Sequence, residues 1–192
     1  MQILLLNGAD EHDEFANVVC RCFEESCQEM GHEVTPMVLR NMEMADCPGD
    51  YECFIKTPGS CTLEEDDGNH LFQQWTKSHL VIAVTPIHYG GFSVHLNRAT
   101  GRHLPGIVPL MEKRNGEVHF RARYDRLPSL VFVGLTDEDD EEKEGVFRRL
   151  VKENTSMFDP PASAMGIIKG TTDKEGIVVE VSRLLQKVGA HQ

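Results

Sequence analysis

Five short apolar segments, spaced along the whole chain, most strongly limit the folds that this sequence can adopt. They span residues 2–7, 34–39, 80–84, 129–135 and 164–169. Residues 80–84 are continuously apolar rather than alternating, which is typical of a strand buried on both faces. Segments with helical spacing separate the apolar runs, so the pattern predicts a parallel sheet with helices on both faces.

Helical spacing is clearest over residues 15–30, and Gly31 ends that segment well. Further helices are expected to open at Asp66 and Asp67, to be capped by Ser93, and to include residues 146–151 and 177–188. We therefore expect one domain over residues 1–192, an α/β, flavodoxin-like three-layer sandwich. Its five-stranded parallel sheet would have the order 2-1-3-4-5. In that order the loops at 8–14 and 85–92 flank one crevice, and the acidic block at 137–142 lies nearby.

Two segments depart from this alternation. Residues 42–65 hold three cysteines among prolines and glycines, so we expect an ordered cysteine loop with no helix or strand. Residues 104–128 form an inserted arm in which Asn115-Gly116 is a strong hairpin signal. Long excursions of this kind often serve as lids or assembly arms. The arm is also the basic region of the chain, with Lys113, Arg114, Arg121, Arg123 and Arg126.

Charge and cysteine usage limit partners and location. The net charge of −12 argues against nucleic acid or an anionic membrane as a partner. No apolar run approaches the roughly 20 residues that span a bilayer, and the N-terminus does not read as a signal peptide. Six cysteines without a secretory signal indicate a reducing, cytoplasmic compartment. Three of them, Cys20, Cys22 and Cys27, fall on the first helix and are interpreted as small hydrophobes or surface thiols.

The segment from Thr85 to Arg98 carries the strongest functional signal. Pro86 cannot donate to a strand ladder and should end the third strand. Gly90 and Gly91 allow unusual dihedral angles or close approach to a ligand. Ligands of open α/β sheets bind at the carboxyl ends of strands. Spacing alone leaves two interpretations open, a ligand loop and a tight turn that binds nothing.

Residues 85–102, TPIHYGGFSVHLNRATGR, resemble the flavin loop and following helix of the NADPH-dependent FMN reductase family. The cysteines at 47, 53 and 61, the segment Thr57-Pro58-Gly59-Ser60-Cys61 and the acidic pair 66–67 are similar to the iron–sulfur flavoprotein branch. The resemblance covers nearly the whole chain and is most specific over residues 47–98.

This resemblance implies FMN as cofactor, NAD(P)H or a protein as electron donor, and a dimer or tetramer in which the arm reaches a neighbour. It implies that residues 86–91 line the flavin ring, whose hydride chemistry belongs to the flavin itself. The full set of cofactor-binding residues that we expect is Gly8, Asp10, Phe15, Ala16, Asn17, Thr85, Pro86, Ile87, His88, Tyr89, Gly90 and Gly91.

The sequence departs from the family pattern at two places. Asp50 stands where the branch has a fourth cysteine. Cys47, Cys53 and Cys61 with one carboxylate could hold a cluster with a labile corner or a three-iron form, and they could equally form a zinc-like site, a disulfide or nothing. We expect no ordinary iron–sulfur cluster there. The loop at 8–14 has four acids where the family has hydroxyls and basic groups for the FMN phosphate, and carboxylates would repel that dianion.

Three functions follow from these observations. The first is an FMN-dependent NAD(P)H oxidoreductase or flavin reductase. The second, favoured by Asp50 and the acidic loop, is a flavodoxin-fold protein that has lost FMN and acts as a non-catalytic partner or regulatory subunit. The third is an electron carrier whose acidic surface docks to a basic redox protein.

Overall fold

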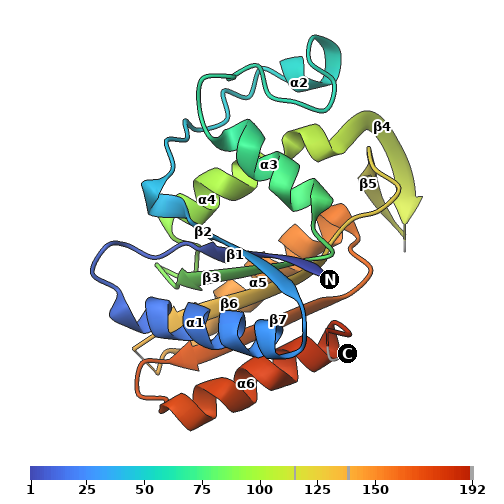
Figure 1. Ribbon diagram of the computed structural model, residues 1–192. Helices are drawn as coiled ribbons and strands as arrows, with labels where there is room; N and C mark the ends of the chain where they lie inside the picture. Colours follow the sequence, from blue (N-terminus) through green and yellow to red (C-terminus); the bar gives the residue numbers. More distant parts are fainter. Residues whose placement is uncertain (115, 138, 191–192) are drawn as a thin grey trace.

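A five-stranded parallel sheet forms the centre of the computed structural model, which describes residues 1–114, 116–137 and 139–190. The sheet has the order β2-β1-β3-β6-β7 (Figure 1). The predicted order 2-1-3-4-5 is thereby confirmed, since β4 and β5 belong to the arm. The strands of the sheet are β1 (Gln2–Asn7), β2 (Glu33–Val38), β3 (Leu80–Pro86), β6 (Ser129–Thr136) and β7 (Ser163–Lys169).

Helices cover both faces of this sheet, which confirms the predicted three-layer sandwich. The helices α1 (Glu14–Glu29) and α6 (Lys174–Lys187) pack on one face. The other face is covered by α3 (Gly68–Lys77), α4 (Val94–Gly101) and α5 (Glu141–Phe158) (Figure 1). Successive strand residues point to opposite faces of the sheet. Leu5 therefore packs in the first core, beneath α1 and α6, and Leu6 in the second, beneath α3, α4 and α5. Within the described residues, no helix is both long and apolar enough to cross a bilayer.

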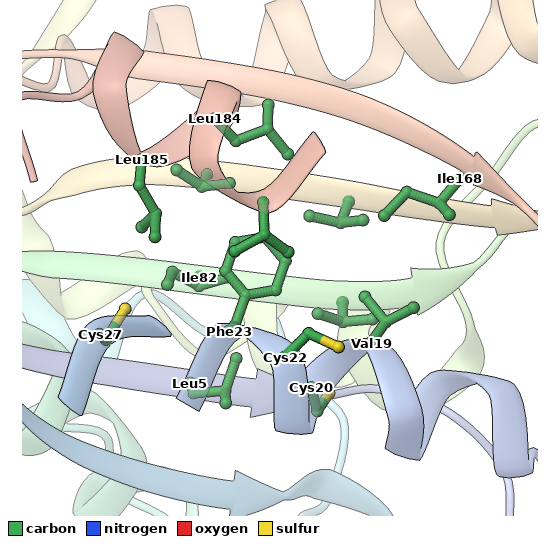
Figure 2. Close-up of a cluster of buried hydrophobic side chains, with 14 of the residues drawn as sticks. Leu5, Val19, Cys20, Cys22, Phe23, Cys27, Ile82, Ile168, Leu184 and Leu185 are labelled. Atoms are coloured by element: carbon green, nitrogen blue, oxygen red, sulfur yellow. The ribbon is translucent and has the colours of Figure 1, made fainter. Parts of the chain in front are cut away.

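The three cysteines of α1 lie in the first core. Figure 2 shows Phe23 of α1 directed toward the sheet among Ile82 and Leu184, with the three thiols on the same helix. Burial raises the pKa of Cys20 to about 12 and that of Cys27 to about 11. A protonated, buried thiol is neither a nucleophile nor a metal ligand. The three cysteines are therefore small hydrophobes rather than surface thiols.

The cysteine loop is more structured than the sequence predicted. The single-turn 3₁₀ helix η1 (Leu39–Asn41) precedes it, and a short helix, α2 (Glu52–Ile55), lies within it. The prediction that residues 42–65 contain no helix was wrong. The Oδ1 atom of Asp50 accepts the backbone N–H of Glu52 at 3.0 Å and so supports the first turn of α2. Four-residue helices have no periodicity that a sequence can reveal.

The inserted arm is the predicted hairpin. A 3₁₀ turn, η2 (Leu104–Gly106), leads into β4 (Ile107–Arg114), which pairs antiparallel with β5 (Glu117–Ala122). The arm lies outside the central sheet (Figure 1). Of the predicted Asn-Gly signal, Asn115 lies outside the described residues, and Gly116 has a φ of +91° that suits glycine.

Helix α3 opens after the acidic pair 66–67 as predicted, and helix α5 includes the predicted residues 146–151. Helix α3 begins at Gly68, and Asp67 occupies its N-cap position without capping it, because its Oδ2 accepts the N–H of Glu43 at 2.8 Å. Helix α5 begins at Glu141, capped by Asp140, so the last two residues of the acidic block are helical. Acids in the first turn of α5 interact favourably with the helix dipole.

Candidate functional site

The loops at 8–14 and 85–92, predicted to flank one crevice at the reversal of strand order, line two separate pockets. The strand β3 pairs with β1 on one side and with β6 on the other, and all three strands point to the same edge of the sheet. The N–H of Gly8 donates to the carbonyl of Val84 at 2.8 Å, and the N–H of Ile87 donates to that of Leu135 at 2.8 Å. These bonds hold the loops after β1, β3 and β6 together at that edge.

A tight turn from His88 to Gly91 is the most unusual part of this edge. The N–H of His88 donates to the carbonyl of Gly91 at 3.1 Å, and the N–H of Gly91 donates back to that of His88 at 2.7 Å. The two residues between them have positive φ, +52° at Tyr89 and +81° at Gly90, as in a type I′ turn. A bulky residue rarely adopts this conformation. The turn presents Tyr89 with its side chain 100% exposed.

The turn rests on helix α5. A Cβ atom added at Gly90 would lie 2.6 Å from Val146, so only glycine permits this approach. Between the turn and the start of α5 is a pocket of about 580 Å³. It is lined by Ile87, His88, Tyr89, Asp140, Glu142, Lys143 and Val146.

Thr85 and Ser93 support the turn from its buried side. Both side chains are buried, and the Oγ1 of Thr85 accepts the N–H of Ser93 at 3.0 Å. Ser93 caps α4 as predicted, its Oγ accepting the N–H of Leu96 at 3.2 Å. Pro86 ends β3, as its missing donor required. Thr85 therefore braces the loop from the interior and does not face the pocket.

A second pocket, of about 690 Å³, opens beside the loop after β1. Its lining combines acids and bases from three segments of the chain. The Nε2 of His95 lies 3.1 Å from the Oδ1 of Asp10, and the Nη1 of Arg40 donates to the carbonyl of Ala9 at 3.3 Å. The lining residues are Asp10, Glu11, His12, Arg40, Asn41 and His95.

The N-terminus of α1 is closed by side chains of the chain itself. Asp13 is its N-cap, and the Oδ1 of Asp13 accepts the N–H of Ala16 at 2.9 Å. The Oδ1 of Asn7 accepts the N–H of Ala9 at 3.0 Å, while its Nδ2 donates to the Oδ1 of Asn17 at 3.0 Å. Asn7 and Asn17 thus stabilise the loop.

Three of the predicted binding residues serve packing. Ala16 is fully buried in the first core, and Phe15 packs against that core. A Cβ atom at Gly8 would lie 3.1 Å from both Leu96 and Ser93, so this glycine lets the loop approach α4. Among the predicted set, the residues that face a pocket are Asp10, Ile87, His88 and Tyr89.

Sequence reasoning missed several residues that line the two pockets. Arg40 follows β2 at the same sheet edge, and the rule that ligands bind at carboxyl ends of strands could have identified it. The sequence predicts Val146 on a helix, but the approach of Lys143 and Val146 to the turn is a property of the tertiary structure. No sequence pattern identifies His95 as a pocket residue, because its partner Asp10 is 85 residues away.

The structure gives no support to a metal site in the cysteine loop. Within the described residues, no group of three or more His, Cys, Asp or Glu side chains is arranged to hold a metal ion. Cys47 is exposed, whereas Cys53 and Cys61 are buried. Burial first, and then the nearby Cys61, Cys47 and Asp50, raise the pKa of Cys53. Asp50, which stands where the branch has a fourth cysteine, supports the first turn of α2.

Three solved structures show that the fold recurs in other proteins. Azoreductase AzrA is 13% identical with a TM-score of 0.68, covering 100% of this chain and 99% of its own. An NAD(P)H:quinone oxidoreductase from Methanothermobacter marburgensis is 15% identical with a TM-score of 0.66, covering 100% and 98%. An FMN-dependent NADH-azoreductase from Bacillus anthracis str. Ames Ancestor, solved in complex with FMN, is 12% identical with a TM-score of 0.61, covering 98% of each chain. No curated protein matches the chain.

A family description matches residues 1–103, more than half of the chain, and that segment contains both pocket-lining loops after β1 and β3. The match supports FMN as cofactor, a nicotinamide as reductant and flavin-dependent oxidoreduction as the class of function. The chain belongs to the NADPH-dependent FMN reductase family.

Proposed function

We propose that the chain uses NAD(P)H to reduce a flat aromatic acceptor through a flavin held against the turn from His88 to Gly91. The single observation that carries the proposal is this strained turn at the β1–β3 switch point, which borders a pocket of about 580 Å³. Strained backbone at the mouth of a pocket is characteristic of functional sites. When bound, the flavin supplies the hydride and electron transfer, and the protein supplies binding and orientation.

The ring end of the flavin suits the residues present. The turn places His88 beside the pocket, and the exposed ring of Tyr89 offers an aromatic face on which a flat molecule can stack. The buried Ile87 forms the apolar floor, with its N–H already bonded to Leu135. The turn would therefore orient the flavin and keep water from one side of it.

The phosphate end does not suit the residues present. The N–H of Ala16, which an anion at this helix start would use, already donates to Asp13, and carboxylates surround the entrance. No step of the proposed function depends on that end of the cofactor.

The acceptor is proposed from the charges that line the first pocket. Asp140 and Glu142 outnumber Lys143 there, which disfavours an anionic acceptor. Quinones and azo compounds, the substrates named for the structural neighbours, are flat and aromatic, and the uncharged ones suit this pocket.

A homo-oligomer, dimer or tetramer, is part of the proposal. The arm exposes the apolar side chains of Leu110, Met111 and Val118, each more than half exposed. Adjacent exposed apolar side chains, here Leu110 and Met111, commonly mark an interface. A cytoplasmic location is proposed because all six cysteines are free thiols, as a reducing compartment maintains them. Light scattering of the purified chain tests the assembly, and a monomeric mass would contradict it.

A steady-state assay tests the proposed activity. The chain is mixed with FMN, a quinone and either NADH or NADPH, and nicotinamide oxidation is followed by absorbance. We expect oxidation that requires protein, flavin and acceptor together. Flavin binding without nicotinamide oxidation would favour the electron-carrier function, and absence of flavin binding would favour the cofactor-free partner.

A further inference from the structure

The start of helix α1 is occupied by an anion of the chain itself. Helix N-termini attract phosphate because their first N–H groups lack partners. Here the carboxylate of Asp13 accepts the N–H of Ala16 at 2.9 Å, and the carbonyl of Asp13 accepts that of Asn17 at 3.4 Å. The N–H of Ala9 is held by the side chain of Asn7 at 3.0 Å. The carboxylate of Asp13 thus occupies an N–H group that an anion at this helix start would otherwise bind.

The charge around this helix start is also unfavourable for a phosphate. Residues 10–14 contain four carboxylates, and Asp10 and Glu11 line the second pocket directly. Arg40 is the arginine that lines this pocket, and its Nη1 already donates to the carbonyl of Ala9. The ring of His95, which could meet an anion, is bonded to Asp10 at 3.1 Å. A dianion entering here would meet more like charge than opposite charge.

We propose that the loop at 8–14 removes the usual preference for a phosphorylated flavin, so that riboflavin and FMN bind with similar affinity. Binding would then depend on the ring and the turn from His88 to Gly91. A flavin without a phosphate anchor exchanges readily, so it would serve as a dissociable substrate of the reductase. This inference rests on the proposed function, because it concerns the other end of the same flavin.

Flavin fluorescence gives a direct test that does not depend on turnover. The purified chain is titrated into riboflavin and into FMN, and the dissociation constants are taken from the change in fluorescence. We expect the dissociation constants for riboflavin and FMN to agree within about threefold. FMN binding more than about thirtyfold tighter than riboflavin would overturn the inference while leaving the proposed function intact. If neither flavin bound, the proposed function itself would fail.

Variants of the loop at 8–14 distinguish an effect of its charge on FMN binding from an effect on folding. The pair Asp13→Ser and Glu11→Gln removes two charges, and serine retains the ability to cap α1. We expect this variant to bind FMN about tenfold more tightly, with riboflavin affinity unchanged. Glu29→Gln, at the opposite end of the same helix, removes an exposed acid and should change neither constant.

The single change Glu11→Gln keeps the test valid if the double variant folds poorly, since Glu11 is exposed in the loop before α1. It should also tighten FMN binding selectively, by a smaller factor. Unchanged FMN affinity in a folded Glu11→Gln protein, or an equal change for riboflavin, would show that the acids do not act on the phosphate and would overturn the inference.

Discussion

The carboxylate of Asp66 is paired with the guanidinium of Arg102. The Nη2 of Arg102 lies 2.9 Å from the Oδ1 of Asp66, and the Nη1 of Arg102 donates to the Oδ2 of Asp66. The same Nη1 donates to the carbonyl of Ala45 at 3.0 Å. The side chain of Arg102 is only 1% exposed. Burial disfavours the charged form of Asp66, but the hydrogen bonds from Arg102 and from two backbone N–H groups outweigh it and lower the pKa of Asp66. The pair thus fastens both ends of the cysteine loop to the end of α4.

Removing this buried partner should be costly. Asp66→Ala leaves the charge of Arg102 buried without a counterion, which we expect to lower the free energy of unfolding by about 3–5 kcal/mol. Asp46→Ala is the matched control, because Asp46 pairs with Arg98 at 2.9 Å but is 80% exposed, and it should cost below about 1 kcal/mol. Urea unfolding measures both. Equal losses in the two variants would show that the cysteine loop is not held by this pair.

The position of Gly90 against α5 should tolerate no side chain. Gly90→Ala places a Cβ atom 2.6 Å from Val146 at a φ of +81°, so we expect a loss of about 1–3 kcal/mol in unfolding free energy. Gly145→Ala, on α5 itself, meets no atom within 4 Å and should stabilise the helix by about 0.5–1 kcal/mol. Thermal denaturation compares the two, and a neutral Gly90→Ala would contradict the close packing of the turn.

A buried histidine should make stability depend on pH. Desolvation lowers the pKa of His103 to about 4, below its ordinary value of 6.5. The unfolded chain then binds more protons than the folded chain between these values, so His103 contributes stability that is complete above pH 6.5 and lost as the pH falls toward 4. The full contribution is roughly 3 kcal/mol, taking 1.36 kcal/mol per pKa unit.

The variant His103→Phe keeps an aromatic ring against Trp75, whose centroid is 5.1 Å away. It should flatten the pH dependence of unfolding free energy between pH 4 and 6.5, whereas the exposed His70→Gln should leave it unchanged. Urea unfolding at a series of pH values gives the slopes. A wild-type slope in His103→Phe would assign the effect to other groups.

Variants of Tyr89 distinguish its effect on the geometry of the turn from its proposed role in stacking on the flavin. Tyr89→Asn replaces a bulky residue at a φ of +52° with one that adopts this conformation readily, so the protein should gain about 1 kcal/mol in stability. The same change removes the aromatic face, and we expect flavin or quinone affinity to fall by about three- to tenfold. Tyr89→Phe should retain both affinities. Weakened binding in Tyr89→Phe but not in Tyr89→Asn would refute stacking.

The fold was largely predictable because its signals are local. Continuous apolar runs gave all five sheet strands, and the order of the strands followed from their number and spacing. Helix starts were less predictable wherever a side chain finds a distant partner. Asp67 accepts the N–H of Glu43 rather than capping α3, and no sequence pattern shows that exchange.

The candidate site was predicted in outline and not in detail. The glycine pair at 90–91 correctly indicated a turn at the sheet edge, because positive φ is a local property. The role of Asp13 as a helix cap follows from its position before α1, whereas its charge alone predicts only repulsion of a phosphate. Arg40, His95 and Lys143 come from three separate elements, and their convergence is a property of tertiary structure.

The most direct test of the account is the visible difference spectrum of FMN on titration with the purified chain. We predict a saturable shift of the flavin absorbance that Gly145→Ala retains and Gly90→Ala weakens, because the ring lies against the turn that Gly90 permits. A spectrum identical to that of free FMN at every protein concentration would contradict a flavin site at the turn from His88 to Gly91.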